Sequence, residues 1–235
     1  MKENQVHISV IVPVFNASQH IEYFYTCLSA ALIKIGRNFE TIFINDGSSD
    51  STLEKLTWLS ERDSSLRLIN QPCNLGQYSA INKGISQARG EILVIMDDDQ
   101  EYALKCIPIF LKRIADGDDL VLGWRIKRDI PLWRMVGSQV TNLMISAVLC
   151  KRIHDLGGTK VFGNKGARAL GSCGSLLKVI KSYRQLRISQ VRMNDTSCRV
   201  SRYNLKKSLW LFLQVIGMLL NLPERNLKGK KIINA

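Results

Sequence analysis

The segment that decides the fold is Glu91-Ile-Leu-Val-Ile-Met-Asp-Asp-Asp-Gln-Glu101, in which an unbroken apolar run leads directly into three aspartates. A short, continuous apolar run is typical of a strand buried on both faces, as in a parallel sheet. Open α/β sheets bind their ligands just beyond the carboxyl ends of such strands. The segment therefore predicts a buried strand that ends in an acidic loop at a ligand site.

Other apolar runs repeat this pattern along the chain. We predict strands at residues 8–13, 41–45, 66–69 and 120–123, and a further strand at 189–193. Helical stretches separate them at residues 21–35, 52–60, 78–88 and 104–115, and another helix is expected at 132–149. Ser51 and Glu54 have the spacing of a capping box at the start of the second helix. The alternation predicts an α/β fold with a mostly parallel sheet flanked by helices.

The composition is that of a folded globular protein. The chain has 235 residues, 46% hydrophobic and 23% charged, which is enough apolar material for one full core with a small appendage. This excludes the disordered, collagen-like and disulfide-rich classes. The polar stretch from Met1 to His7 predicts no signal peptide. Six scattered cysteines without a C-x-x-C pair indicate reduced thiols of a cytosolic protein rather than a closed zinc site.

Charge is divided unevenly along the chain. Residues up to Gly123 hold 11 basic and 16 acidic side chains, a net charge of −5, whereas those from Trp124 onward hold 22 and 4, a net charge of +18. The first part can carry an acidic, metal-binding site, and the second faces something anionic. Charge alone leaves phosphates, a membrane surface and nucleic acid open as partners.

The acidic segment is a candidate metal site. Three adjacent carboxylates repel one another, so something has to offset the cost of placing them together. Because alternate side chains at a strand end point the same way, Asp97, Asp99 and Glu101 could converge on one hard cation. Mg²⁺ or Mn²⁺ with a nucleoside diphosphate suits such a site. The alternative is a solvated acidic turn, but the position after a buried strand favours the metal site.

Several short motifs follow the predicted strands in a fixed order. They are Pro13-Val-Phe-Asn16, Asn45-Asp-Gly-Ser-Ser-Asp-Ser-Thr52, Asn74-Leu-Gly-Gln77, Lys83-Gly84, Ala88-Arg-Gly90 and Met96-Asp-Asp-Asp99. In this order they resemble the family 2 glycosyltransferases, which have the Rossmann-like GT-A fold. The resemblance implies nucleoside contacts by Pro13, Phe15 and Asp46. It also implies that Asp97 and Asp99 hold the metal and the diphosphate of a nucleotide-sugar.

The second part of the chain resembles one subgroup, the polyprenyl-phosphate glycosyltransferases, which include dolichol-phosphate mannosyltransferase and undecaprenyl-phosphate glucosyltransferase. The similarity lies in Gly123-Trp-Arg-Ile-Lys-Arg128, Arg134-Met-Val-Gly-Ser138 and Arg199-Val-Ser-Arg-Tyr203. It implies an acceptor-phosphate site made of Arg125, Arg128, Arg134 and Ser138, and a donor-phosphate contact by Arg199. Glu101 takes the place of Gln in the D-x-D-x-Q metal motif of the subgroup. The catalytic residues would be Asp97, Asp99, Arg125 and Arg134.

Residues 204–235 are expected to be separate from the glycosyltransferase domain. We place that domain at residues 1–203, with a donor half (1–123) and an acceptor half (124–203). The apolar run 209–220 has basic flanks and is shorter than the roughly 20 residues that span a bilayer. It predicts either an amphipathic helix on the membrane surface or a helix packed on the core or on a membrane-protein partner. We expect a cytoplasmic protein held peripherally on the inner face of the membrane.

The expected reaction is an inverting transfer of a hexose from a UDP- or GDP-sugar to polyprenyl phosphate, with Mg²⁺ or Mn²⁺ as cofactor. A phosphate monoester is already anionic at neutral pH and needs no strong general base. One alternative acceptor is a saccharide hydroxyl in surface-polysaccharide or O-antigen synthesis, for which Asp155 or Asp129 would serve as base. A second alternative is a non-catalytic scaffold subunit. Nucleic acid is not expected as a partner, because the acidic triplet would repel its phosphates.

Overall fold

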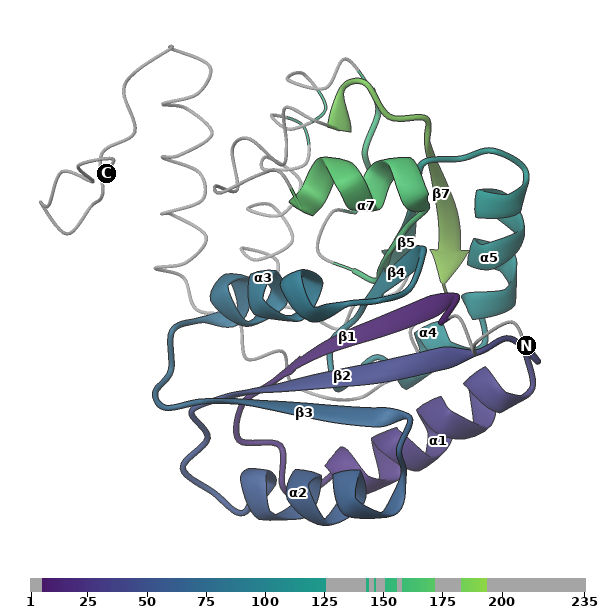
Figure 1. Ribbon diagram of the computed structural model, residues 1–235. Coiled ribbons are helices and arrows are strands. Elements are labelled where there is room, and N and C mark those ends of the chain that lie inside the picture. The colour runs from purple at the N-terminus through teal and green to yellow at the C-terminus, as the bar shows by residue number, and fades with distance from the viewer. Residues whose placement is uncertain are drawn as a thin grey trace, which may run out of the picture.

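The computed structural model describes residues 6–125, 143, 146, 151–155, 158–171 and 183–193. These residues form a seven-stranded sheet with the order β3-β2-β1-β4-β6-β5-β7, flanked by helices (Figure 1). The predicted α/β class with a mostly parallel sheet is confirmed. Of the helix expected at 132–149, the described residues Leu143 and Ser146 are helical. The segment 204–235 lies outside the described residues.

The first four strands form the regular part of the sheet. They are β1 (Ile8–Val14), β2 (Phe39–Asp46), β3 (Leu66–Gln71) and β4 (Ile92–Ile95), and the helices between them are α1 (Ile21–Ile33), α2 (Thr52–Arg62) and α3 (Gln77–Gln87). β2 and β4 both pair in parallel with β1, and β3 pairs in parallel with β2. All four predicted strands are present, as expected for apolar runs in a covered parallel sheet.

The remaining elements join the sheet less regularly. α4 (Glu101–Leu104) and α5 (Ile107–Ala115) lead to β5 (Leu120–Arg125), and β6 (Lys160–Phe162), α7 (Asn164–Gly171) and β7 (Ile188–Met193) follow. The short strand β6 lies between β4 and β5 and runs antiparallel to both, whereas β5 and β7 are parallel. The sequence did not predict β6 or α7, because three residues carry too little periodicity to identify a strand.

The helix predicted at 104–115 corresponds to α5, and a short helix that was not predicted, α4, precedes it. α4 is one turn long, and α5 begins at Ile107 with Pro108 in its first turn. Proline lacks a backbone N–H, so it interrupts a helix interior but fits the first turn of a helix. Pro108 is therefore compatible with a helix that begins at Ile107.

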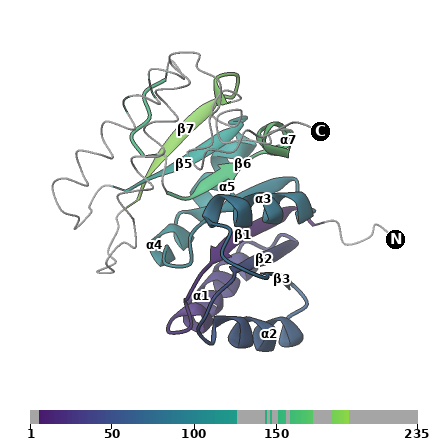
Figure 2. The same cartoon turned by 90° about the vertical axis from the view of Figure 1, so that its left-hand side faces the viewer.

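Helices cover both faces of the sheet (Figures 1 and 2). α1, α2 and α5 pack on one face, where Val12 and Phe24 belong to the same buried cluster. α3 and α7 lie on the other face, where Ile11 and Ala80 belong to a second cluster. Neighbouring residues of β1 thus enter different cores, as the two-residue period of a strand requires. α3 approaches the sheet closely at Gly84, where a Cβ would lie 2.5 Å from Ile11 Cγ2.

α2 does not begin with the predicted capping box. Ser51 is its N-cap residue, but the Ser51 side chain makes no capping hydrogen bond. Instead, the Asp50 carboxylate accepts the backbone N–H of Thr52 at 3.0 Å and that of Ser18 at 3.2 Å. Burial alone would raise the pKa of Asp50, but the hydrogen bonds from Thr52 and Ser18 lower it to about 2. Asp50 therefore starts the helix and ties it to the loop after β1.

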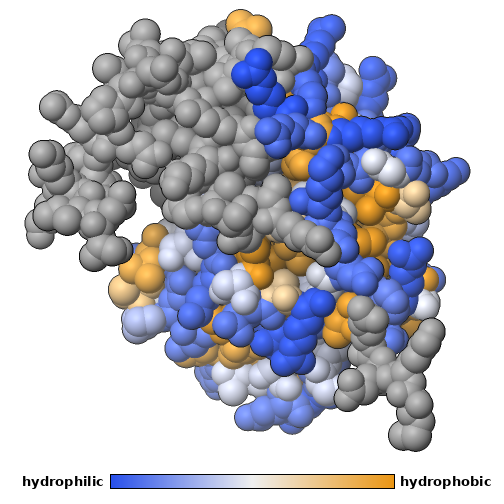
Figure 3. Space-filling view, turned by 45° about the horizontal axis from the view of Figure 1, so that its top comes forward, coloured by the Kyte–Doolittle hydropathy of each residue, from blue (hydrophilic) through white to orange (hydrophobic). Residues whose placement is uncertain are grey.

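The surface of the described residues is mixed in character. On the face shown in Figure 3, hydrophilic side chains surround the apolar ones. Large exposed apolar side chains such as Tyr23, Ile33 and Trp58 are distributed over α1 and α2. Single exposed apolar residues are common on protein surfaces and require no special explanation. Among the described helices, none has the length and apolar character needed to cross a membrane.

Candidate functional site

Six chain segments meet at one edge of the sheet, where the parallel strands end. The loops after β1, β2, β3 and β4 lie there, at residues 15–20, 47–51, 72–76 and 96–100. β5 ends at the same edge with Trp124 and Arg125, because it has the same direction as β4. β6 begins there, since it is antiparallel, with Lys160 opposite Ile95 and Leu122. This carboxyl edge is the candidate site.

The loops after β1 and β2 are hydrogen-bonded to each other. The Asn16 side-chain oxygen accepts the backbone N–H of Ser49 at 2.8 Å, and the backbone N–H of Ala17 donates to Thr52 Oγ1 at 2.8 Å. Phe15, the first residue after β1, is 40% exposed. Pro13 is buried within β1. Of the two predicted nucleoside contacts in this segment, only Phe15 is therefore exposed.

Asp46, the third predicted nucleoside contact, holds the loop after β3. Its two carboxylate oxygens accept the backbone N–H groups of Leu75 and Gly76, at 2.8 and 2.9 Å, and only 3% of the residue is exposed. The next residue, Gly47, has a φ of 66°, and a Cβ there would lie 2.4 Å from the carbonyl carbon of Cys73. Only glycine permits this approach. The loops after β2 and β3 thus form one packed unit around Asp46.

The acidic segment leaves the strand direction before its carboxylates can alternate. β4 ends at Ile95, residues 98 and 99 form a turn, and Glu101 begins α4. The two-residue period of side chains ends with the strand. Within the described part of the chain, no three His, Cys, Asp or Glu side chains are grouped so that they could hold a metal ion. The strand alternation on which the shared metal site of Asp97, Asp99 and Glu101 was based therefore ends at Ile95, and the assignment of these three residues to a metal ion stays a prediction.

Asp97 is held by two glutamine side chains. Its carboxylate accepts hydrogen bonds from Gln77 Nε2 at 2.6 Å and from Gln100 Nε2 at 2.9 Å. The Gln100 amide oxygen in turn accepts the hydroxyl of buried Thr159 at 2.6 Å. The sequence comparison placed Glu101 in the position of a metal-motif glutamine, whereas its neighbour Gln100 contacts Asp97. The spacing of the motif could not predict that residue 100 rather than residue 101 contacts Asp97, because the contact depends on the turn that follows β4.

The next two aspartates differ in their partners. Asp98 Oδ2 lies 3.1 Å from Nε2 of His20, a residue of the loop after β1. Asp99 makes no side-chain hydrogen bond or ion pair to another residue that the structure describes. The three consecutive carboxylates are therefore not equivalent: Asp97 and Asp98 are bound to neighbouring loops, and Asp99 is not.

Negative charge is poorly compensated at Asp97 and Asp99. Burial and the neighbouring charge of Asp99 raise the pKa of Asp97 to about 6. Burial and the charge of Asp98 likewise raise the pKa of Asp99. A raised carboxyl pKa means that the ionised form is destabilised, and a divalent cation would relieve this. Since Mg²⁺ is usually held by one or two carboxylates together with substrate phosphates, this pair fits such an ion.

Two basic side chains enter the same edge from β5 and β6. Burial lowers the pKa of Lys160, although the charges of Asp97 and Asp155 oppose the shift. Arg125 Nε is ion-paired with Asp155 Oδ2 at 3.0 Å, and the Asp155 side chain is only 3% exposed. Burial alone would lower the pKa of Arg125, but the charge of Asp155 raises it. Lys160 was missed because nothing in the sequence marks an isolated lysine before an unrecognised strand.

Most of the predicted acceptor-phosphate residues are not described by the structure. Arg128, Arg134 and Ser138, together with the predicted donor-phosphate residue Arg199, lie outside the described residues. Arg125 is the described member of the set. Its neighbour Trp124 stacks on the His154 ring, with centroids 4.1 Å apart. The guanidinium of Arg192 also lies 4.8 Å from the Trp124 ring centre, so Trp124 is engaged in packing at this edge.

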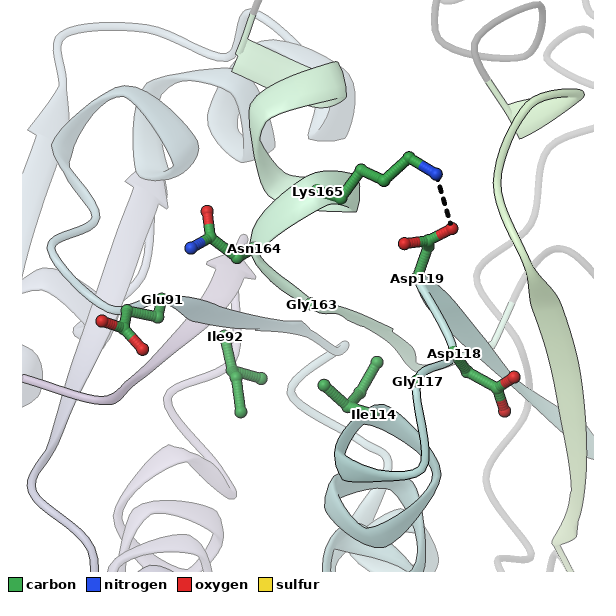
Figure 4. A pocket seen from close by; sticks show the side chains of 9 residues that line it. All are labelled: Glu91, Ile92, Ile114, Gly117, Asp118, Asp119, Gly163, Asn164 and Lys165. Atoms are coloured by element: carbon green, nitrogen blue, oxygen red, sulfur yellow. Dashed lines mark hydrogen bonds and ion pairs between the residues drawn. The ribbon is translucent and has the colours of Figure 1, made fainter.

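A hollow of about 320 Å³ lies at the opposite edge of the sheet, near the first residues of β4 and β5 (Figure 4). Within it, Lys165 Nζ is ion-paired with Asp119 at 3.3 Å (Figure 4). Asp118 is ion-paired with Arg187 Nε at 2.9 Å. These charges compensate one another, unlike those of Asp97 and Asp99 at the carboxyl edge, so this hollow is the weaker candidate. Another hollow, of about 520 Å³, adjoins the carboxyl edge at Leu75.

Comparison with known sequences identifies a matching family and similar proteins. A sequence model described as "Glycosyl transferase family 2" matches residues 9–179. The chain is 33% identical over 153 residues to undecaprenyl-phosphate 4-deoxy-4-formamido-L-arabinose transferase from Pseudomonas aeruginosa, covering 64% of this chain and 44% of that protein. It is 24% identical over 225 residues to dodecaprenyl-phosphate galacturonate synthase from Rhizobium johnstonii, covering 91% and 67%. The chain therefore spans less than half the length of the first relative.

Comparison with solved structures supports the same architecture. Glucosyl-3-phosphoglycerate synthase from Mycobacterium tuberculosis, crystallised with Mn²⁺, UDP and glucosyl-3-phosphoglycerate, matches with a TM-score of 0.66 at 19% identity, covering 93% of this chain and 81% of that one. S. aureus TarS 1–349 matches with a TM-score of 0.57 at 22% identity, covering 94% and 67%. At this identity the similarity establishes a shared fold.

Proposed function

The chain belongs to glycosyl transferase family 2 and has its GT-A fold, and from this premise we propose that it transfers a hexose from a nucleotide-sugar to polyprenyl phosphate. The observation that carries the proposal is the carboxyl edge, where Asp97 lies near the charges of Asp99, Lys160 and Arg125. Relatives named for transfer to undecaprenyl phosphate and for dodecaprenyl-phosphate galacturonate synthesis support this class of acceptor.

We assign the nucleotide, UDP or GDP, to the loops after β1, β2 and β3. The exposed ring of Phe15 is available to stack on the base. Asp46 would act by fixing the loop at residues 72–76, since both of its oxygens already accept backbone N–H groups. Pro13 would contribute through the buried end of β1 rather than through a direct contact.

Asp97 and Asp99 would hold the divalent ion, Mg²⁺ or Mn²⁺. When bound, this ion supplies charge neutralisation for the diphosphate leaving group. Gln77 and Gln100 would keep the Asp97 carboxylate in a fixed orientation. Lys160 would add a fixed positive charge beside the same phosphates, where a preorganised charge stabilises the transition state most effectively.

We place the acceptor at the side of the site formed by the end of β5. The residues that would bind its phosphate are Arg125, Arg128, Arg134 and Ser138. Asp155 engages Arg125 Nε, and the guanidinium has further N–H groups that can donate to a phosphate. A phosphate oxygen attacks the anomeric carbon opposite the leaving group, so a new C–O bond forms as the bond to the nucleoside diphosphate breaks, with inversion. Since the nucleophile is an anion, the protein's task is to orient it.

A saccharide hydroxyl is the competing acceptor, and it would require a carboxylate base. Asp155, one of the two candidates for that base, is buried and ion-paired with Arg125. A carboxylate committed to a cation is a poor proton acceptor, so this contact favours the phosphate acceptor. The other candidate, Asp129, lies outside the described residues.

We further propose that the protein works at the cytoplasmic face of the membrane, where a polyprenyl phosphate presents its head group. Residues 204–235 would contact the membrane surface or a membrane-protein partner, and Arg199 would contact the donor phosphate. The basic character of the chain from Trp124 onward supports attraction to an anionic surface.

The test is transfer of radiolabelled sugar from a panel of UDP- and GDP-sugars into an organic-extractable product, with undecaprenyl phosphate, membranes, and Mg²⁺ or Mn²⁺. A metal-dependent product that mild acid cleaves is the expected result. Binding or hydrolysis of the nucleotide-sugar without a lipid product would move the acceptor to a saccharide. Absence of nucleotide-sugar binding would contradict the enzymatic proposal and favour a scaffold subunit.

A further inference from the structure

His20 and Asp98 form a contact that the proposed reaction does not itself require. The two residues are 78 positions apart in the sequence, and the distance from Nε2 to Oδ2 is 3.1 Å. Only 15% of the His20 side chain and 19% of the Asp98 side chain are exposed. A hydrogen bond to a carboxylate is stronger where water is largely excluded. The contact is therefore more than an incidental surface pairing.

The backbone of His20 is fixed at the point where the first loop enters α1. Its N–H donates to the Ala17 carbonyl at 3.0 Å, and its carbonyl accepts the N–H of Phe24 at 2.9 Å. An N-cap residue commonly uses a side-chain oxygen to bind free N–H groups of its helix. His20 occupies the N-cap of α1 without any such bond. Its ring reaches the loop after β4 instead.

The same contact closes a ring of hydrogen bonds around the carboxyl edge. Each of its four loops is linked to the next through residues that lie in a loop or directly beside it and are far apart in the sequence. The pairs are Asn16 with Ser49, Asp46 with Leu75, Gln77 with Asp97, and Asp98 with His20. The ring holds the acidic loop from two sides, through Asp97 on one side and Asp98 on the other.

Asp99 follows directly after these two fixed residues. Its side chain accepts a hydrogen bond from its own backbone N–H and none from another described residue, so its placement depends on the backbone that carries it. Groups that orient a metal-binding side chain from outside the metal's immediate ligands control affinity in this way. The geometry assigns such a part to the residue that anchors Asp98.

We infer that His20 is a positioning residue, which through Asp98 holds Asp99 ready to bind the divalent cation, and that Asp98 itself is not a ligand. This deepens the proposed function and rests on it. A neutral imidazole is sufficient, because it carries one N–H that can donate to the carboxylate. The pairing also offsets part of the repulsion among three adjacent carboxylates.

Binding of Mn²⁺ in the presence of UDP or GDP, followed by electron paramagnetic resonance, tests the inference without relying on turnover. His20→Ala should weaken Mn²⁺ binding about 10-fold, the lower end of the range for residues that orient a metal ligand. His20→Gln keeps a side-chain N–H able to donate to Asp98, and should recover most of the affinity. His7→Ala removes an exposed histidine and should leave the affinity unchanged.

A double-mutant cycle on the metal-free protein tests the pair itself. If His20 and Asp98 act together, the losses in Tm caused by His20→Ala and Asp98→Ala will not add in the double variant. Additive losses, combined with unchanged Mn²⁺ binding in His20→Ala, would overturn the inference.

Failure of the proposed function gives a different pattern. If Asp99→Ala binds Mn²⁺ and nucleotide as the unmodified protein does, or if the unmodified protein binds neither, the metal assignment is wrong. Non-additive losses of Tm in the double-mutant cycle would then show that His20 and Asp98 form a structural contact only. The inference that His20 positions a metal-binding residue would be overturned as well. If Asp99→Ala loses Mn²⁺ binding while His20→Ala retains it, the metal site stands and only the inference about His20 fails.

Discussion

Buried carboxylates at the two edges of the sheet have pKa values shifted in opposite directions. Near the edge where the strands begin, Glu40 is buried and accepts hydrogen bonds from Ser9 Oγ at 2.7 Å, Arg67 at 2.8 Å and the backbone N–H of Arg89 at 2.7 Å. Burial alone would raise the pKa of Glu40, but these donors lower it. At the carboxyl edge, burial and the charge of Asp99 raise the pKa of Asp97 to about 6.

The difference lies in how completely each charge is compensated. Glu40 accepts hydrogen bonds from an arginine and further donors, so its ionised form is stabilised in the folded protein. Asp97 is hydrogen-bonded only to two neutral amides, and the charges of Lys160 and Arg125 do not outweigh burial and the two neighbouring aspartates, so its ionised form is incompletely compensated. Incomplete compensation near a cleft is characteristic of a functional site, whereas complete compensation is characteristic of a structural one. The following predictions test that contrast.

The largest expected effect is the loss of activity when a carboxyl-edge aspartate is removed. Asp99→Ala should lower divalent-dependent sugar transfer at least about 100-fold, because a group that fixes charge against the leaving group is lost. The Tm of the metal-free variant should not fall, since a destabilised charge has been removed. Radiolabelled lipid product and thermal unfolding measure the two quantities. Glu101→Ala is the control and should keep most activity; an equal loss there would return Glu101 to the metal site.

The second effect belongs to the opposite edge and concerns stability. Glu40→Ala should lower the free energy of unfolding by about 2–3 kcal/mol, because it leaves Arg67 and two other donors without their acceptor. Activity per folded molecule should be retained. Urea unfolding measures the change, and Glu61→Ala, at an exposed position of α2, is the matched control. Similar losses of unfolding free energy in the two variants would show that the contacts of Glu40 do not stabilise the fold.

A smaller effect is expected from the lysine that partly compensates the carboxyl edge. Lys160→Met should weaken binding of the nucleoside diphosphate with Mn²⁺ about 10-fold, through loss of a charge-assisted contact to phosphate. Lys160→Arg keeps the charge and should bind nearly as the unmodified protein does. Isothermal titration calorimetry gives both affinities. Unchanged binding in Lys160→Met would limit this lysine to offsetting the charge of Asp97.

An effect of similar size is a pH dependence of metal binding. Protons compete with the cation for Asp97, so a pKa of about 6 predicts that Mn²⁺ affinity falls about 10-fold between about pH 7 and pH 5. Asp97→Asn should bind Mn²⁺ weakly with a much flatter pH profile over this range. A steep profile that persists in the variant would assign the titration to another group.

The same shifts give the two carboxylates opposite contributions to stability. The folded-state pKa of Asp97 lies above its unfolded value of 3.8, so its ionisation destabilises the metal-free protein above about pH 6, and this cost disappears as the pH falls below 3.8. The folded-state pKa of Glu40 lies below its unfolded value of 4.5. Glu40 therefore contributes stability above pH 4.5 that is lost as the pH falls through its folded pKa.

The parallel part of the fold could be predicted because each of its strands carries its own signal. The runs that became β1, β2, β3 and β4 are short and apolar and are separated by helical stretches, so no long-range information was needed to identify them. β6 has three residues and could not be identified in this way. Inserting it between β4 and β5 brings Lys160 to the carboxyl edge, and no local pattern reports such an insertion.

The candidate site was predictable in its residues but not in their roles. The aspartates and the order of the loops were evident in the sequence. Which carboxylates are hydrogen-bonded depends on partners from other parts of the chain, such as His20 for Asp98 and Gln77 for Asp97. The nucleoside contact expected of Asp46 stays a prediction, and the structure adds that Asp46 binds the backbone of the loop after β3.

By itself, the sequence determined the class of fold, the edge of the sheet that carries the candidate site and the family to which the chain belongs. These follow from periodicity and motif order, which are local properties of the chain. Only the tertiary structure decided which charges are compensated. Gln77 lies 20 positions from Asp97 and His20 lies 78 positions from Asp98, and a carboxylate's pKa depends on the groups around it in space. The chemistry of the site is set by those contacts between loops.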